Sequence, residues 1–422
     1  MSAGISAPIA PRLSFVTRIR EPIPIQADRS PMNAVAQSKA NPMVFVFVAA
    51  ALALLAVIYF TPVWWVSLTA PNYPPEAFPD GVRIQFHMNG VFNGCKRVEK
   101  AEITEQEALD CVHEMDTINH YVGMYPIAAG GVIERAFSPF LITFLGIMLI
   151  GFVVPRPGLR LPVMGIAFAA LAGWMYLYFY GEGGLKLQNA GYLEALVTSM
   201  DQAAGEAEAK ELSPGQALIA RLKAELEKSM GADEKAAAKG AQAEGTDKQR
   251  YLDNLQATFA KDQERRGTDE PWTGSGSQML AWHYDKSLGR YFNNPAEIGP
   301  MVKTMSGAAH AVFWLLIGAM LLLLWGARKN GGPLYWLLVL VPIALPLFFL
   351  IDYSAWLWWY GHNLNDMGAF TVKPFMPTVF GQGKVAQFAT HSYPSLGFGL
   401  MLGMSALLAL AALLRRKELQ AQ

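Results

Sequence analysis

Six long apolar segments constrain this chain more than any other feature. A helix that crosses the hydrocarbon core of a membrane needs about 20 predominantly apolar residues. The 422-residue chain is 52% hydrophobic and only 16% charged, which is more apolar than ordinary soluble proteins. We therefore predict an α-helical membrane protein with six transmembrane helices. The predicted spans are 43–66, 138–155, 161–180, 307–326, 334–351 and 396–414.

Basic residues beside the spans predict their orientation. Arginine and lysine are enriched in short cytoplasmic loops. In this chain they lie before the first span, in the turns "PRPGLR" and "GARKNGG", and in the tail 415–422. These four places alternate correctly if both termini are cytoplasmic. Residues 1–42, rich in Pro, Ser, Ala and Arg without apolar periodicity, then form a disordered cytoplasmic arm.

Three segments are therefore expected outside, in the periplasm of a bacterium whose inner membrane holds the spans. The first, 67–137, is predicted to be a small α+β domain. Its sequence "VRIQFHMNGVFNGC" suggests a strand, a turn at the Asn-Gly pair and a second strand. A capping box of Thr104 and Glu107 predicts a following helix from about residue 105 to 121.

The other two outer segments differ in character. Within 181–306, the part from about 191 to 266 is rich in Ala, Glu, Lys and Gln with helical periodicity, which predicts a helical-hairpin insertion. The segment 352–395 has few regular signals and many glycines, prolines and aromatic residues. Loops of this length tend to build a functional site.

Both cysteines of the chain, Cys95 and Cys111, fall in the first outer segment. Two cysteines in one small domain outside the cytoplasm usually form a disulfide. We predict that bridge, with a pair of metal-binding thiolates as the alternative.

Histidine and methionine form a stripe at the end of the predicted helix. At about 100° per residue, His113 and His120 lie within about 20° of each other, with Met124 about 20° to the other side and Asp116 one turn from each histidine. Imidazole and thioether suit copper, especially Cu(I), and a carboxylate can fix the tautomer of a ligating histidine. The stripe predicts a copper site. The alternative is that the histidines face solvent and the methionines belong to the core.

The sequence favours chemistry on the outer face over transport through the spans. No predicted span carries a charged residue in its middle, whereas proton-coupled pumps and ion carriers usually need one. Walker, CxxCH, HExxH and plausible GxSxG motifs are absent from the sequence. A net charge of zero gives no hint of a nucleic-acid partner. These observations leave enzymatic activity unassigned.

Four short motifs, "APNYP", "INHYVGM", "YGHNLND" and "HSYPSLG", occur in an order that resembles a family of poorly characterised bacterial polytopic membrane proteins. That family is associated with nitrous-oxide reductase accessory proteins and periplasmic copper handling. The resemblance does not extend to residues 1–42 or 190–270, nor to the two cysteines. It implies a site that includes Asn119, His120, Tyr121, Met124, Tyr360, His362 and Asn363.

The predicted function is to bind copper at the periplasmic face and to deliver it to, or assist the assembly of, a partner metalloenzyme. Membrane lipid and a periplasmic protein are the expected partners. Two alternatives remain: a structural or assembly subunit of a membrane oxidoreductase complex without its own metal, and a metal-dependent membrane redox enzyme. The predicted ligands are His120, Met124 and His362, then His87, Met88, His113 and His391, supported by Asp116, Asn119, Tyr121, Tyr360 and Asn363.

Overall fold

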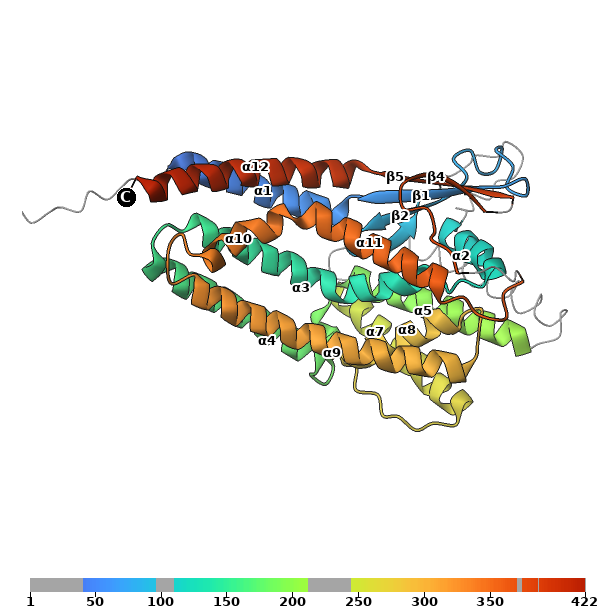
Figure 1. Ribbon diagram of the computed structural model, residues 1–422. Coiled ribbons are helices and arrows are strands. Elements are labelled where there is room, and N and C mark those ends of the chain that lie inside the picture. Colours follow the sequence, from blue (N-terminus) through green and yellow to red (C-terminus); the bar gives the residue numbers. More distant parts are fainter. Residues whose placement is uncertain (1–40, 96–109, 212–243, 370–373, 386, 422) are drawn as a thin grey trace, which may run out of the picture. The chain divides into compact units, whose positions relative to one another are not determined.

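The computed structural model describes the chain between residues 41 and 421, except for gaps inside that range. Most of the described chain is helical, with one small antiparallel sheet (Figure 1). Thr104 and Glu107 of the predicted capping box, and nearly all of the predicted arm 1–42, lie outside the described residues. Those described are 41–95, 110–211, 244–369, 374–385 and 387–421.

Five described helices are long and apolar enough to cross a membrane. A sixth span is made by α10 (Pro333–Ile343) and α11 (Leu345–His362) if this pair, bent by 63°, crosses as one. Pro342 lies beside the break and lacks the N–H that an unbroken helix requires. The number of spans and their orientation stay predictions. The five single helices are α1 (Pro42–Phe60), α3 (Ala128–Val153), α4 (Pro157–Phe179), α9 (Pro295–Gly326) and α12 (Leu396–Gln420).

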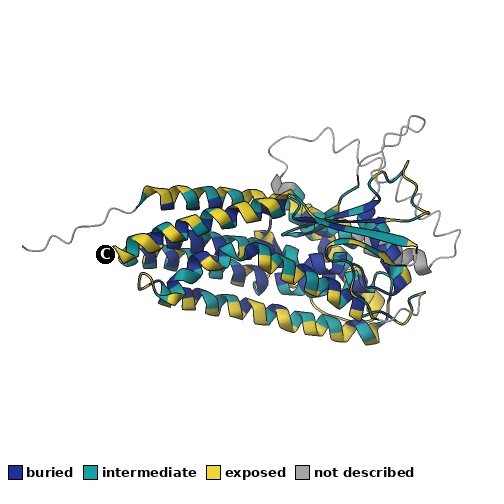
Figure 2. Cartoon of the chain, turned by 45° about the horizontal axis from the view of Figure 1, so that its top comes forward, coloured by how far each residue is buried: buried dark blue, intermediate teal, exposed yellow. Residues whose placement is uncertain are grey.

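Two of these helices begin well before the predicted spans. α3 begins at Ala128 and α9 at Pro295, whereas the spans were predicted to begin at residues 138 and 307. The hydropathy pattern marks only the apolar part of a helix, and both helices continue through more polar turns. Exposed residues, yellow in Figure 2, follow the outer sides of the long helices. Many of them are large and apolar, among them Phe45, Ile166 and Leu315, as expected of surfaces that contact lipid.

α1 and α12 pack side by side, and each continues into a strand (Figure 1). α1 leads into β1 (Trp64–Thr69), and β5 (Phe388–Pro394) leads into α12. β1 and β5 pair antiparallel, and the Ser395 N–H donates to the Val63 carbonyl at 2.9 Å where helices meet strands. The helix pair and the strand pair thus form one continuous support.

The sheet has the strand order β3-β2-β1-β5-β4, with every neighbouring pair antiparallel. β2 (Val82–His87) and β3 (Gly90–Asn93) form the predicted hairpin. β4 (Gly381–Val385) joins β5 in a second hairpin, which the sequence analysis did not predict. One face of the sheet is apolar and buried, with Trp64, Val66, Leu68, Val82 and Ile84.

The remaining helices belong to the outer segments. α2 (Cys111–Val122) contacts β2 and β3, whereas α8 (Gly276–Gly289) packs on α3 and α9. α5 (Ala190–Glu211) and α7 (Glu244–Arg266) pack together, burying Leu193, Leu196, Leu255 and Phe259. Both helices agree with the helical periodicity of residues 191–266. The predicted hairpin stays a prediction, because residues 212–243 lie outside the described residues.

Candidate functional site

The first and third outer segments meet, although about 240 residues of sequence separate them. The Gly123 carbonyl accepts a hydrogen bond from the Asn365 N–H at 2.7 Å. The Tyr360 hydroxyl accepts from the Gly130 N–H at 2.8 Å and donates to the Ile127 carbonyl at 3.1 Å. Two of the four motifs, "INHYVGM" and "YGHNLND", are therefore in direct contact through backbone groups.

A buried polar cluster reinforces this contact. The Asn365 amide donates to Glu297 Oε2 at 2.6 Å and to the Tyr125 hydroxyl at 3.3 Å, and that hydroxyl donates to Glu297 Oε2 at 3.2 Å. Burial raises the pKa of Tyr125, so its hydroxyl keeps its proton. The cluster joins the start of α9 to both outer segments.

Two residues of the predicted stripe, His113 and His120, lie on the same side of α2. His113 and His120 both face the residues that connect α8 to α9. His113 Nδ1 lies 3.4 Å from the Tyr291 hydroxyl. The His120 ring lies 5.2 Å from the Tyr291 ring and 4.6 Å from the Phe292 ring, centroid to centroid. The two imidazoles therefore pack in an aromatic environment.

Met124 does not lie on that stripe, and its predicted place on the helix is wrong. α2 ends at Val122 because Gly123 takes the left-handed conformation, with φ 91°. The Met124 side chain is 4% exposed and belongs to the apolar core. Tyr121, predicted to support the site, is 52% exposed, whereas Asn119 is buried.

Asp116 caps the start of a helix. It was predicted instead to fix the tautomer of a ligating histidine. Its Oδ1 accepts the Ile127 N–H at 2.8 Å, and the Ala128 N–H also bonds to the carboxyl. These N–H groups stand at the start of α3, where a helix leaves donors unsatisfied. The carboxyl is 1% exposed, so it serves the folding of this region.

We expect Asp116 to make stability depend on pH. Burial raises its pKa from 3.8 to about 7. Because the folded pKa exceeds the unfolded one, its contribution is fully present below pH about 4 and is lost as the pH rises through about 7. Asp116→Asn keeps an oxygen that accepts the hydrogen bonds but cannot titrate. Unfolding temperatures of detergent-solubilised protein, followed by tryptophan fluorescence, should fall less steeply with pH in this variant. Equal slopes would contradict the assignment.

The other predicted ligands lie in separate places. His362 ends α11, exposed, with Nδ1 2.8 Å from the Trp358 carbonyl and its ring stacked on Trp358. The His87 ring meets the Phe92 ring edge to face at the end of β2, beside Met88 in the turn. The Asn363 side chain donates to the Trp359 carbonyl at 2.9 Å, as part of the end of α11.

His391 lies on a different surface from the α2 histidines, on the solvent face of the sheet. Within the described part of the chain, no group of three or more His, Cys, Asp or Glu side chains is placed to hold a metal ion. Copper binding by the predicted residues stays a prediction, and these residues do not form one cluster by geometry.

The predicted disulfide is confirmed. Cys95 and Cys111 are bridged, with their Cα atoms 5.9 Å apart. The bond ties the chain just after β3 to the first residue of α2. Bridged sulfurs are not thiolates, so the alternative of a thiolate metal pair does not apply to this form of the protein.

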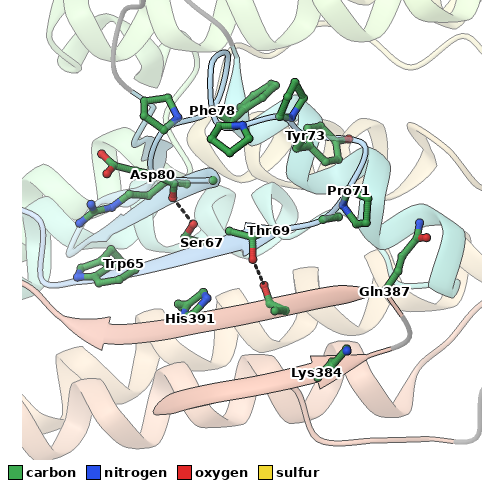
Figure 3. Close-up of a pocket in the computed structure, with 17 residues that line it drawn as sticks. Trp65, Ser67, Thr69, Pro71, Tyr73, Phe78, Asp80, Lys384, Gln387 and His391 are labelled. Carbon is green, nitrogen blue, oxygen red and sulfur yellow. Dashed lines mark hydrogen bonds between the residues drawn. The ribbon is translucent and has the colours of Figure 1, made fainter.

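A cavity of about 650 Å³ opens on the solvent face of the sheet (Figure 3). We call it the sheet cavity. Its floor is formed by side chains of four strands, and its wall by the proline-rich segment 70–81. Tyr73 and Phe78 in that wall stack edge to face at 5.1 Å, and the Tyr73 hydroxyl donates to Glu114 Oε2 on α2 at 3.1 Å. The wall is therefore fixed to the rest of the outer domain.

A polar row crosses the solvent face of the sheet, and three of its four members line the sheet cavity. The strand register places Arg83, Ser67, His391 and Gln382 opposite one another on β2, β1, β5 and β4, so all four lie on the same face. The Arg83 guanidinium stacks over the Trp65 ring at 4.1 Å. Its Nε is buried and has no hydrogen-bond partner among the described residues.

His391 is the one member of this row among the residues predicted from the sequence; Arg83, Ser67, Gln382 and the neighbouring Lys384 were not predicted. The alternation in "WWVSLT" was a usable signal, because Trp65, Ser67 and Thr69 fall on one face of a strand. That stretch was instead predicted to belong partly to a membrane span.

Comparison of the chain with protein-family models, curated proteins and solved structures gives no match, so the resemblance of the four motifs stays a prediction.

Proposed function

We propose that the protein is a membrane-anchored docking subunit that holds an extended segment of a partner protein in its sheet cavity. The observation that carries this proposal is that the cavity reaches from β1 across the sheet to Lys384 on the edge strand β4. β4 stands at one end of the strand order, and its described contacts are mainly with β5. An open strand edge presents unpaired N–H and C=O groups to which another strand can add.

β4 leaves room for another backbone at its first residue. Its sequence begins Gly381-Gln382-Gly383. A side chain added at Gly381 would meet no atom within 4 Å, whereas the space beside Gly383 is filled by Thr378 of the same chain. Lys384 is exposed and lines the sheet cavity. A strand added at this edge would place alternate side chains over the cavity, where they could be recognised.

The lining predicts the chemistry of the partner segment. Arg83, His391 and Lys384 come from three strands, with Asp80 as the acidic side chain of the lining. Arginine and lysine bind carboxylates, whereas Trp65 and the proline-rich wall offer apolar contact. The partner segment should therefore be extended and acidic, with apolar residues between the acids.

The support formed by α1, β1, β5 and α12 favours a docking role. β2 pairs with the free edge of β1, and β4 pairs with the free edge of β5. β1 follows the candidate span α1 directly, and β5 leads directly into the candidate span α12. A partner bound at β4 would be held at a fixed height above the membrane. That role corresponds to the alternative of an assembly subunit, and its link to a membrane oxidoreductase complex stays a prediction.

Site-specific photocrosslinking tests the docking proposal. A photoreactive phenylalanine replaces Thr69 or Gln387, which line the cavity, in cells of the native host. The control is the same substitution at Asp253, an exposed residue of α7. Both cavity positions should capture one partner, and mass spectrometry should locate the adducts in an extended acidic segment.

A charge reversal sharpens that test. Lys384→Glu should lower the crosslinking yield several-fold because it repels an acidic segment. Lys261→Glu, on exposed α7, should leave the yield unchanged. Adducts confined to lipid, adducts in a basic segment, or a yield indifferent to Lys384→Glu would contradict the proposal.

Copper delivery is a second candidate, supported by the shared environment of His113 and His120 on α2. Two imidazoles can bind Cu(I), and the neighbouring Tyr291 and Phe292 rings would limit access of water. Met124 and His362 do not belong to this smaller site. Copper would be the cargo of the protein in this case.

We expect the pair of substitutions His113→Ala and His120→Ala to abolish Cu(I) binding if this second candidate is right. Competition between the purified protein and a coloured Cu(I) chelator measures the affinity. His362→Gln serves as the control and should leave the affinity unchanged. An equal loss in the His362→Gln variant would instead support the larger site predicted from the sequence, and undiminished binding in the double variant would eliminate both.

A further inference from the structure

A second cavity, of about 490 Å³, lies among β3, α2, α3, α5 and α8. We call it the arginine cavity, because Arg135 of α3 and Arg290 at the end of α8 both line it. It is separate from the sheet cavity, and the two share no lining residue. Its volume lies within the range of small-molecule sites, about 300–1,000 Å³.

Arg135 is held in place without a carboxylate partner among the described residues. It is half-buried, and its guanidinium lies over the Phe92 ring at 5.5 Å. Buried or partly buried charges in proteins are normally paired, since leaving water is costly for an ion. An arginine that faces a cavity in this state is suited to an anion from outside.

The neighbouring polar groups can complete such a site. His283 Nε2 lies 3.0 Å from Ser199 Oγ, and both residues line the cavity. Burial, together with the positive charges of Arg135 and Arg290, lowers the pKa of His283 to about 3. The imidazole is therefore neutral at physiological pH, and the positive charge near this wall comes from the two guanidinium groups.

The remaining lining is mixed in character. Val91, Val112 and Val132 supply apolar surface. The carboxyl groups in the lining, Asp110 and Glu194, belong to exposed residues, and the Asp110 side chain already accepts the N–H groups at the start of α2. The inner wall is thus cationic and apolar.

We propose that the arginine cavity binds a small organic carboxylate, with its carboxylate on Arg135 and its apolar body against the valine side chains. Arginine matches the planar carboxylate with two parallel N–H donors. The Ser199 hydroxyl lies in the same lining and can donate to a remaining lone pair, whereas the Thr198 hydroxyl already donates to the Glu194 carbonyl at 2.9 Å. This inference is independent of docking at the sheet cavity.

The test uses matched pairs of probes and the full chain in detergent. Benzoate and hexanoate are compared with benzamide and hexanamide, which have the same shape without the charge. The carboxylates should raise the unfolding temperature saturably, and the amides should not. Arg135→Gln should weaken carboxylate binding about tenfold or more, because a hydrogen bond to a charged group is lost. Arg328→Gln, in an exposed turn, is the matched control.

A second measurement keeps the test independent of how well the Arg135→Gln variant folds. Phenylglyoxal modifies accessible arginines, and mass spectrometry of the wild-type protein reports each site. Benzoate should protect Arg135 and leave Arg328 reactive. The proposal is overturned if amides bind as well as carboxylates, if no carboxylate binds at millimolar concentration, or if benzoate leaves the reactivity of Arg135 unchanged.

Discussion

Replacing both cysteines by serine should lower the free energy of unfolding of the outer domain by about 3 kcal/mol, the amount expected for a disulfide that closes a loop of this size. Cys95 and Cys111 are 16 residues apart in sequence. Their bond limits the unfolded chain and holds the start of α2 against the sheet. The unfolding temperature of the Cys95→Ser/Cys111→Ser variant should therefore fall well below that of the oxidised wild type.

Reduction of the wild type provides the control for that experiment. Because the described chain has no free cysteine and the sequence has only two cysteines, a reductant can act on no other bond. Reduced wild type and the double-serine variant should unfold at the same temperature. A variant as stable as the oxidised protein would show that the bond does not restrain the outer domain.

The second large effect is expected at Gly123, where the outer segments meet. Gly123 has φ 91°, and an added Cβ would lie 2.8 Å from the Asn365 carbonyl oxygen. Gly123→Ala combines an unfavourable backbone conformation, of order 1–3 kcal/mol, with a clash against backbone. It should destabilise the protein and speed amide hydrogen exchange at Asn365, whose N–H bonds to Gly123.

Gly299→Ala is the matched control, since Gly299 lies in α9 and an added Cβ there would meet no atom within 4 Å. Alanine favours a helix over glycine by about 1 kcal/mol, so this variant should be as stable as the wild type or more so. Gly123→Ala with unchanged stability and exchange would mean that the contact between the outer segments is dispensable.

Hydropathy, turn residues and helical periodicity predicted the elements that depend on short stretches of sequence. Hydropathy located the apolar helices, although α3 and α9 begin earlier than their apolar parts. The Asn-Gly pair indicated the β2–β3 hairpin, although the turn lies one residue earlier, at Met88 and Asn89, and Gly90 pairs with His87. Helical periodicity indicated α7. The disulfide between Cys95 and Cys111 followed from their number and their expected compartment.

Contacts between distant parts of the chain were not predictable from one sequence. β1 and β5 pair although more than 300 residues separate them. Neither sequence contains a local signal that identifies the other as its partner strand. Gly123 and Asn365 meet for the same reason. The stripe on α2 held for His113 and His120 but failed for Met124, because helical projection assumes that the helix continues and Gly123 ends it.

The candidate cavities depend on these distant contacts even more. The row of Arg83, Ser67, His391 and Gln382 exists only because four strands align in one register. The cavity that Arg135 lines is formed by elements that are spread over about 200 residues of sequence. Single residues of both sites were visible in the sequence, but their neighbours were not.

Hydrogen exchange of β4 tests the docking account most directly. The native complex, purified in mild detergent, is compared with the same protein after the partner has been removed by salt. If a partner segment adds to the open edge, the amides of Gly381–Val385 should exchange at least about tenfold more slowly in the complex. Amides of α7 should exchange equally in both samples. Unchanged exchange across β4 while the partner is bound would contradict the account.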